Sequence, residues 1–379
     1  MTFHPIARAV LLASLTAAGA HAQPAAPSPE PPPSPEPSPS SSSLHVGAFV
    51  DAYYAYNSND PADHTNFFPG VGTSAKRHDE ISINLAQVDL TLEPKPVGFK
   101  LALGFGTSTE VVHAAEPGGP FVGPKVWEHV VQASASWQAT DRLLFEAGVY
   151  PSHIGFESFQ TRDNWNYTRS WLGELSPYYQ TGLKTAYRFS EHWSGQLHIL
   201  NGWQSIAENN SSKAVGTQVA YSSNKVSASF NTFVGAELPG DDDDYRVMGD
   251  LVATIRPTDS LSLGVSVDAA REERPVGDSA RWWGMGLYAR YAKPTSKTAF
   301  AVRGEYYDDE DGAISGTAQT LKEITGTIEH RSADHLVLKL EGRYDRSSAD
   351  VFAGDAGEAG SARHKNSQFL VLLGAVASF

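Results

Sequence analysis

Charged side chains of both signs gather in the segment from residue 151 to residue 178. Opposed carboxylates and guanidinium groups around a narrow passage would set up a transverse electric field, which filters polar solutes by size and charge. The candidates for this role are Glu157, Arg162, Asp163, Arg169 and Glu174. The alternative is structural: residues 164–170 would tie the segment to a wall, with Arg169 pairing a wall carboxylate. The elements around the segment must decide between the two.

The residue types and their spacing give little indication of catalysis or metal binding. The chain has no cysteine, which excludes disulfides, thiolate metal sites and a cysteine nucleophile. Its 13 histidines show neither H-x-x-x-H nor H-E-x-x-H spacing. An acidic run could offer Ca²⁺ several carboxylates, although such a run in a loop is more often simply solvated. We expect no enzyme and no cofactor, and the one weak metal candidate is Asp241, Asp242, Asp243 and Asp244.

The first 43 residues differ in composition from the rest of the chain. Residues 1–22 have the pattern of a cleaved secretory signal peptide, with Arg8, a short apolar run and a closing Ala20-His21-Ala22 triplet. Residues 23–43 are rich in proline and serine and predict a disordered spacer. Residues 44–379 remain as the folded domain. The net charge of −14 weighs against nucleic-acid binding, which requires a basic face.

From residue 44 onward, apolar and polar residues alternate with a period of two. In the first stretch Val46, Val50 and Tyr54 share one face, whereas Asp51 lies on the other. The second stretch changes phase part-way, which predicts a bulge or a displaced start. The full set of predicted strands is 44–57, 81–92, 97–107, 126–137, 143–150, 179–188, 193–202, 214–222, 225–234, 246–256, 261–270, 282–291, 298–308, 320–330, 335–345 and 367–379.

The connections between these strands alternate strictly between short turns and long loops. A membrane barrel has this arrangement, with short turns in the periplasm and long loops outside the cell. The predicted fold class is therefore all-β: a transmembrane, antiparallel, up-and-down β-barrel of about 16 strands. Such a barrel keeps one face of each strand polar, which explains a mean hydropathy of only −0.31.

Charged residues in the polar phase of the strands would line the interior of such a barrel. The candidates are Lys184, Arg188, Asp250, Asp268, Arg290, Arg303, Glu305, Lys339, Glu341 and Arg343. The alternative is a wet wall whose charges merely neutralise one another. Because the signs are mixed, the net charge favours the passage of cations only slightly.

The last predicted strand ends on a phenylalanine. Phe369, Val371 and Leu373 alternate along one face up to Phe379, which resembles the terminal signal that the outer-membrane assembly machinery recognises. Aromatic residues also fall near many predicted strand ends, where membrane barrels carry interfacial girdles. We therefore expect the outer-membrane lipid and, through the Phe379 strand, the assembly machinery as partners.

Several short runs between residues 145 and 187 carry a family resemblance. They are Gly148-Val149-Tyr150-Pro151, Gly155-Phe156-Glu157, Asn164-Trp165-Asn166-Tyr167-Thr168-Arg169-Ser170 and Pro177-Tyr178-Tyr179-Gln180-Thr181-Gly182. With these runs the chain resembles the OmpL-like β-barrel porins, the second β-barrel porin family. The resemblance implies a diffusion channel in the outer membrane of a Gram-negative cell. By analogy with other sixteen-stranded porins, a homotrimer is a candidate assembly.

Three functions compete on the sequence alone. The first is a porin through which small hydrophilic solutes and ions diffuse passively, with residues 151–178 as the constriction. The second is a structural or adhesin-like barrel without an open pore. The third is a barrel enzyme, for which His153, His192 and His198 are available but are not selected by any spacing.

Overall fold

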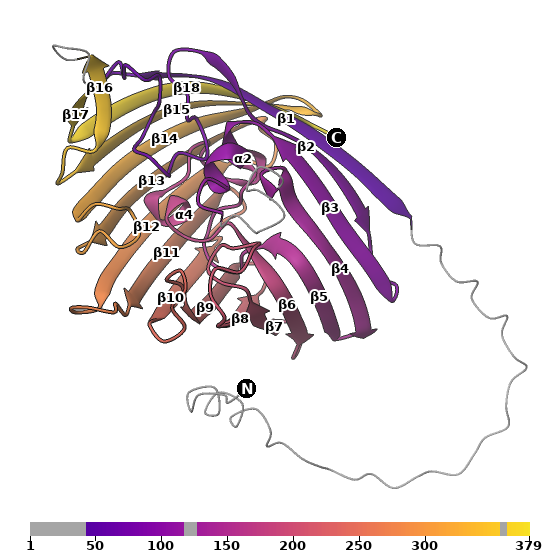
Figure 1. Cartoon of the computed structure of the whole chain (residues 1–379). Helices are drawn as coiled ribbons and strands as arrows, with labels where there is room; N and C mark the ends of the chain where they lie inside the picture. The colour runs from indigo at the N-terminus through magenta and orange to yellow at the C-terminus, as the bar shows by residue number, and fades with distance from the viewer. Residues whose placement is uncertain (1–42, 117–126, 357–361) are drawn as a thin grey trace, which may run out of the picture. The chain divides into compact units, whose positions relative to one another are not determined.

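Sixteen antiparallel strands form one closed barrel (Figure 1). The computed structural model describes residues 43–116, 127–356 and 362–379. The predicted signal peptide (1–22) and the predicted spacer (23–43), apart from Ser43, lie outside these residues. The barrel strands are β1 (Leu44–Asn57), β2 (Ile81–Leu92), β3 (Val97–Phe105), β4 (Val130–Thr140), β5 (Leu143–Pro151), β6 (Tyr179–Arg188), β7 (Trp193–Leu200), β8 (Ala214–Ser222), β9 (Val226–Ala236), β10 (Tyr245–Ile255), β11 (Leu261–Glu272), β12 (Ala280–Ala292), β13 (Thr298–Asp309), β14 (Gln319–Ala333), β15 (Leu336–Ser347) and β18 (Ser367–Ser378).

Short elements occupy three of the longer connections. Helix α2 (Thr107–Val112) follows β3, and the 3-10 turn η1 (Thr161–Asp163) and helix α4 (Trp171–Glu174) lie between β5 and β6. Strands β16 (Phe352–Ala356) and β17 (Ala362–Lys365) form a separate hairpin between β15 and β18. Among the described residues, no helix combines the length and apolar character that a membrane crossing requires.

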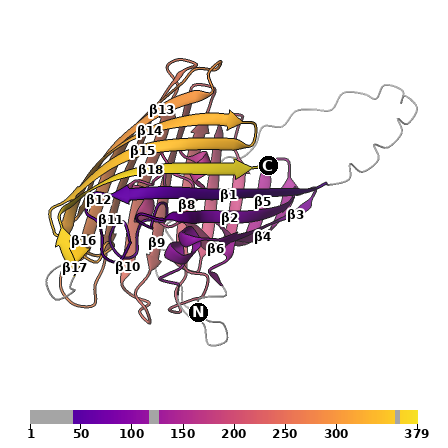
Figure 2. The same cartoon turned by 90° about the horizontal axis from the view of Figure 1, so that it is seen from above.

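The barrel closes by pairing its first strand with its last. Strand β1 is hydrogen-bonded to β18 on one side and to β2 on the other, and Figure 2 shows β1 beside β18. The register places Val50 opposite Ala377 and Tyr54 opposite Leu373. Because neighbouring strands are antiparallel, the connections fall alternately at two ends, which we name the long-loop end and the short-turn end. The predicted sixteen-stranded antiparallel barrel is confirmed.

Each strand presents alternate side chains to the outside and the inside of the barrel. On β18, Phe369 and Leu373 point outward and are 45% and 51% exposed, whereas Leu370 and Leu372 point inward and are buried. Apolar side chains are left exposed on the outer face along the other strands as well, as a lipid-facing surface requires.

The bulge predicted in the second strand is present. The pairing of β1 with β2 shifts between Asp51 and Ala52, so that Asn84 is left without a partner residue on β1. Both Asn84 and Leu85 consequently point inward and are buried, although they are adjacent in sequence. Asn84 donates a hydrogen bond to Asp51 there (2.8 Å).

Several strand ends differ from the predicted ones by a few residues. The strand predicted at 126–137 is β4, which begins at Val130 and runs on to Thr140. Its far end is extended because the Thr140 hydroxyl accepts hydrogen bonds from the backbone N–H groups of Arg142 and Leu143, which makes a very tight turn into β5. Residue 126 lies outside the described residues.

Candidate functional site

The connection between β5 and β6, residues 152–178, is bonded to inward-pointing side chains of the barrel, and we call it the interior segment. Helix α4 of this segment lies against β11, β12 and β13 (Figure 1). The Ser170 hydroxyl caps α4 by accepting a hydrogen bond from Gly173 N (2.9 Å). The helix then continues for a single turn before the chain leaves for β6.

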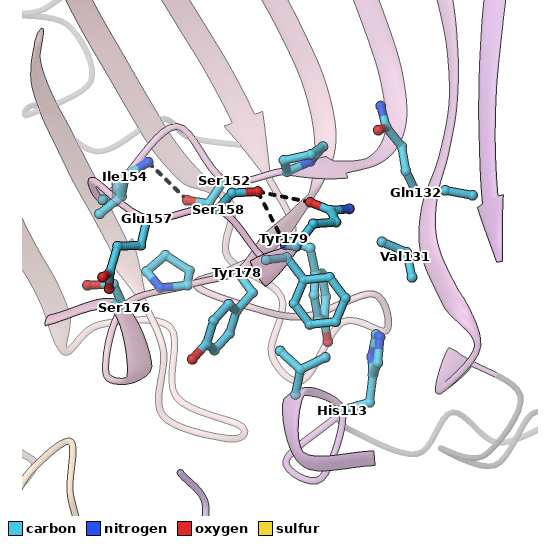
Figure 3. A pocket seen from close by; sticks show the side chains of 18 of the residues that line it. His113, Val131, Gln132, Ser152, Ile154, Glu157, Ser158, Ser176, Tyr178 and Tyr179 are labelled. Atoms are coloured by element: carbon cyan, nitrogen blue, oxygen red, sulfur yellow. Dashed lines mark hydrogen bonds between the residues drawn. The ribbon is translucent and has the colours of Figure 1, made fainter. Parts of the chain in front are cut away.

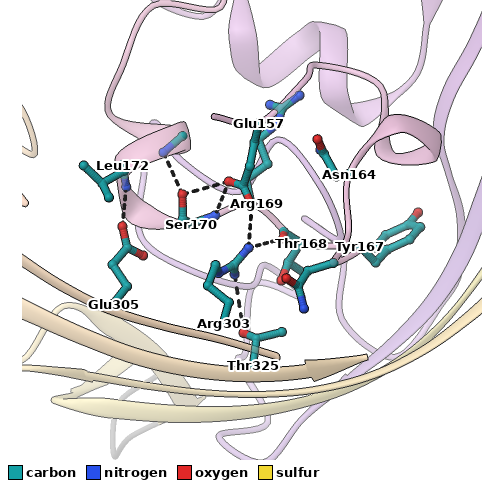
Figure 4. A network of polar contacts seen from close by, with 12 residues as sticks. Glu157, Asn164, Tyr167, Thr168, Arg169, Ser170, Leu172, Arg303, Glu305 and Thr325 are labelled. Carbon is teal, nitrogen blue, oxygen red and sulfur yellow. Dashed lines mark hydrogen bonds and ion pairs between the residues drawn. The ribbon is translucent and has the colours of Figure 1, made fainter. Parts of the chain in front are cut away.

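Two wall carboxylates hold the backbone of the interior segment. Glu341 on β15 accepts hydrogen bonds from Tyr167 N (2.5 Å) and Thr168 N (2.9 Å). Glu305 on β13 accepts hydrogen bonds from the N–H groups of Trp171 and Leu172, both at 2.6 Å. Figure 4 shows Leu172 directed at Glu305. The two carboxyl groups thus satisfy four buried donors, which are two pairs of adjacent residues.

Cations from the same part of the wall hold carbonyl groups and a carboxylate of the segment. Arg303 donates to Glu157 (2.8 Å), to the carbonyl of Thr168 (2.7 Å) and to Glu323 on β14 (2.7 Å) (Figure 4). Lys339 donates to two further carbonyl groups, those of Thr161 and Asn164. Arg343 donates to the carbonyl of Arg169 and pairs with Asp345.

The anchors extend around the wall on both sides of these strands. Asp250 on β10 accepts a hydrogen bond from Gly155 N (2.9 Å), and Asp268 on β11 accepts one from the Ser176 hydroxyl (2.9 Å). Asp51 on β1 accepts one from the Tyr167 hydroxyl (2.7 Å). His153 adds bonds to Thr232 on β9 (3.0 Å) and Gln218 on β8 (3.3 Å), so the interior segment is fixed to the part of the wall that runs from β8 through β15 and β18 to β1.

Glycines on the inner wall make room for side chains of the segment. A Cβ atom on Gly374 of β18 would lie 2.3 Å from the ring of Tyr167. A Cβ atom on Gly264 of β11 would lie 2.7 Å from the ring of Phe156. Both distances are far below van der Waals contact, so these positions need glycine while the segment stays in place.

The charged residues predicted in the segment are mostly paired or enclosed. Glu157 contacts Arg303, and Glu174 accepts hydrogen bonds from Gly72 N and Thr73 N. Arg169 is buried, and its guanidinium carbon lies 4.4 Å from the centroid of the Tyr178 ring.

Arg169 makes its hydrogen bonds to neutral groups. It donates to Thr73 Oγ1 (2.6 Å) and to the carbonyl of Ser158 (2.8 Å). Within the described part of the chain it has no carboxylate within 4 Å, so the wall pairing considered for it is not made. Arg162 and Asp163 are exposed at the segment surface and lie 3.7 Å apart.

The predicted wall residues fall into three groups. Those buried against the interior segment are Asp250, Asp268, Arg303, Glu305, Lys339, Glu341 and Arg343. Two others form ion pairs on the inner face: Lys184 with Glu146, and Arg290 with Glu329 at 2.8 Å. Arg188 lies apart from all of these at the short-turn end, where it is exposed and donates to the carbonyl of Asp141.

The acidic run at the long-loop end forms a turn. Asp241 accepts hydrogen bonds from the N–H groups of Asp243 (2.8 Å) and Asp244 (3.0 Å), and Asp242 accepts one from Ser211 N. Among the residues that the structure describes, no group of three or more His, Asp or Glu side chains is arranged to hold a metal ion.

A cavity of about 360 Å³ lies between the interior segment and the opposite part of the wall. Figure 3 shows Glu157 and Tyr178 of the segment on one side, and Val131 and Gln132 of β4 on the other. Gln87 of β2 and Lys100 of β3 also line it. Sequence reasoning did not single out these wall residues, although the strand alternation places Lys100 and Gln132 in the inward phase.

A second cavity of about 320 Å³ adjoins the first toward the long loops. Val112, Ser176 and Tyr178 line both cavities, so the two meet at these side chains. Glu237 and Arg246 also line the second cavity. Burial, more than the nearby acids Glu272 and Glu208, raises the pKa of Glu237 to about 7. Burial lowers the pKa of His113, beside the first cavity, to about 4.

Comparison with solved structures identifies the same fold in several outer-membrane proteins. An anion-selective porin from Comamonas acidovorans matches with a TM-score of 0.62 at 13% identity, covering 89% of this chain and all of that one. OmpF of Salmonella typhi gives 0.58 at 12% identity, covering 89% and 98%. The channel DcaP of Acinetobacter baumannii gives 0.55 at 14% identity, covering 90% and 99%. At these identities the likeness establishes the fold alone.

Sequence comparison matches this chain to a family model and to no individual curated protein. A family model described as "Putative beta-barrel porin-2, OmpL-like" matches residues 43–379, which comprise the whole barrel. The chain therefore belongs to the OmpL-like β-barrel porin-2 family.

Proposed function

We propose that the protein is an outer-membrane porin through which small hydrophilic solutes and ions diffuse passively, with no chemical step. The observation that carries the proposal is the one-sided attachment of the interior segment. Its anchors lie on β8 to β15 and on β1, whereas the 360 Å³ cavity lies on the β2 to β5 side. On the cavity side the segment makes one bond to a barrel strand in the described residues, from Gln160 to Gln87 of β2 (3.3 Å). The segment would thus narrow the lumen without filling it.

The side chains around this cavity suggest how solutes would be filtered. Glu157 is already neutralised by Arg303, and the other polar groups include the amides of Gln87, Gln132 and Gln160. Lys100 is the one lysine or arginine that lines the cavity in the described part of the chain, and no carboxylate there lies within 4 Å of its ammonium group. We therefore propose a polar passage with one ammonium group, in place of the opposed charges expected from the segment.

Current through single molecules in planar bilayers tests the proposal. Reconstituted protein is expected to produce stable conductance steps that scale with salt concentration, as a water-filled passage requires. Heat-modifiable mobility on a gel would show that the barrel is folded. Folded protein without any conductance would overturn the proposal and support the structural or adhesin-like alternative, which the many wall charges buried under the segment favour.

Deleting residues 157–172 tests the role of the interior segment separately. The deletion removes the segment's contacts with Glu305 and Glu341 and should raise the single-channel conductance, because the lumen is wider without it. A matched deletion at the long-loop end, residues 241–244, should leave conductance within the wild-type range. Unchanged conductance of a folded 157–172 deletion would refute the constriction.

We further propose export by the predicted signal peptide, residence in the outer membrane with the long-loop end outside, and a homotrimeric state. Support for the trimer comes from a solved structure of OmpT from Vibrio cholerae described as a trimer form, which has a TM-score of 0.57 at 10% identity and covers 89% of this chain and 99% of that one. Chemical cross-linking in native membranes followed by electrophoresis would count the protomers.

A further inference from the structure

The outer surface of the barrel carries two pairs of like charges at the long-loop end. Arg271 on β11 lies directly opposite Arg281 on β12, and Lys322 on β14 lies directly opposite Arg346 on β15. All four side chains are exposed. Like charges directly opposite each other on neighbouring strands destabilise a sheet unless an anion lies between them.

The four cations point toward the lipid and away from the interior. Lys322 lies two residues before Ile324, and Arg346 lies two residues after Tyr344, in both cases toward the long-loop end. Ile324 and Tyr344 are 59% and 41% exposed on the outer face. Arg281 likewise lies two residues before the outward Trp283. Strands β11 to β15 are consecutive neighbours in the sheet (Figure 1), so the two pairs share one sector of the outer face, and we name the four residues the basic rim. The pairs are offset along the strands, because the row of Lys322 and Arg346 meets β12 at Met285, four residues from Arg281.

Aromatic side chains fix the depth of the basic rim in the membrane. On the outer face, Trp283 and Tyr344 lie two residues farther from the long-loop end than Arg281 and Arg346. Tyr306 lies directly opposite Lys322, whose ammonium is 5.7 Å from the centroid of the Tyr306 ring. Tryptophan and tyrosine collect at the boundary between acyl chains and head groups. The cations of the rim therefore stand at the level of the lipid head groups.

Few anions within the chain compensate the basic rim. Glu273 pairs with Arg271 (2.5 Å), and Asp308 on β13 lies between the two pairs, where it accepts hydrogen bonds from Tyr306 and Thr320. The Asp311 carboxylate accepts a hydrogen bond from the backbone N–H of Arg281 (2.9 Å). In the described residues, no carboxylate lies within 4 Å of the guanidinium or ammonium groups of Arg281, Lys322 or Arg346. The loops at the same end of the barrel are acidic, with Asp241–Asp244 as one example, so the rim is a local exception.

We propose that the basic rim binds the phosphate groups of lipids in the leaflet at the long-loop end. Arginine guanidinium groups bind phosphate through paired hydrogen bonds, and lysine contributes a point charge. A phosphate between Lys322 and Arg346 would relieve their repulsion, and its acyl chains would lie along the apolar surface below. The proposal is independent of conduction through the barrel.

Lipid binding to the purified full-length protein in detergent micelles tests the proposal. The probes are lipid A with its phosphates, dephosphorylated lipid A and inorganic phosphate, and native mass spectrometry measures the apparent Kd. The double substitution Lys322→Gln and Arg346→Gln should raise the apparent Kd for phosphorylated lipid A by about fivefold per cation removed, or about 25-fold in total. The matched control is Lys225→Gln with Lys293→Gln, two exposed lysines at the short-turn end, and should change Kd less than twofold.

The three probes and one further variant separate the possible outcomes. Tighter binding of phosphorylated than of dephosphorylated lipid A, and weak binding of inorganic phosphate, would support a lipid phosphate site. Equal losses in the double variant and the control, or equal binding of the two lipids, would overturn it. Lys322→Glu should abolish the preference for phosphorylated lipid A, because the new carboxylate would pair with Arg346 and repel a phosphate. The barrel should stay heat-modifiable. A retained preference would also refute the proposal.

Discussion

Replacing Glu341 by alanine removes the anchor of the interior segment with the most hydrogen bonds to it. The carboxylate accepts two backbone donors, Tyr167 N and Thr168 N, and two hydroxyl donors, those of Thr168 and Thr327. All of these groups are buried. The hydroxyl groups can rotate toward other acceptors, whereas the two N–H groups are fixed by the backbone. Glu341→Ala therefore leaves two buried donors without an acceptor.

The size of the effect follows from these two donors. Each buried, unsatisfied donor costs about 1–3 kcal/mol, so the docked state loses about 2–6 kcal/mol relative to a state in which water solvates residues 167 and 168. A loss of about 3 kcal/mol lowers the ratio of docked to released segment about 150-fold. The contacts of Glu305 and Lys339 remain, so we expect local release around residues 166–169 in a barrel that stays closed.

Hydrogen exchange at the N–H groups of Tyr167 and Thr168 measures this release, because both groups are buried and bonded to Glu341 in the docked segment. Mass spectrometry of peptides that contain these residues should show exchange about 100-fold faster than in the wild type when closing is fast relative to exchange. Single-channel records should show additional steps of higher conductance. The control is Glu93→Ala, which removes an exposed carboxylate from a short turn. Exchange and conductance unchanged in Glu341→Ala would refute the anchoring role.

Three further predictions concern selectivity, pH and packing. Lys100→Glu should shift the reversal potential in a salt gradient toward that of a cation-preferring channel, and an unshifted potential would place Lys100 outside the conduction path. Because the pKa of Glu237 is raised to about 7, its carboxyl group is neutral at pH 6 and ionised at pH 8, so the preference for cations should rise with pH through about 7; Glu237→Gln should abolish that step. Gly374→Val should displace Tyr167 from the wall and increase hydrogen exchange at Tyr167 and Thr168 less than Glu341→Ala does, and exchange at the wild-type rate would show that the wall can yield.

The sequence predicts the barrel well because a barrel strand is a local pattern. Alternation alone locates β1, β2, β6 and β8 with the bounds that the structure has, and the change of phase reveals the bulge at Asn84. Each strand must present one face to lipid, so the signal recurs in every one of them. Errors in the barrel strands remain only at their ends, where side chains such as that of Thr140 decide how tightly the chain turns. The hairpin of β16 and β17 is not predicted, because residues 346–366 are assigned to a long loop.

The interior segment is much less predictable, because its anchors are distant in sequence and involve backbone groups. Glu341 contacts the N–H groups of residues 167 and 168, and an N–H group has no sequence signature. The charges of Glu157 and Arg303 look free in the sequence, yet they neutralise each other across the barrel. Helix α2 has only six residues, which is too short for a periodic pattern.

The position of Tyr167 links the interior segment to the assembly of the barrel. Its hydroxyl group is bonded to Asp51 on β1, its N–H group to Glu341 on β15, and its ring packs on Gly374 of β18. These three strands are the ones that meet at the closing seam, where the two ends of the sheet join. One residue therefore clamps the seam from inside, and it can do so only after the first and last strands have paired. Docking of the segment consequently reports that the barrel is complete.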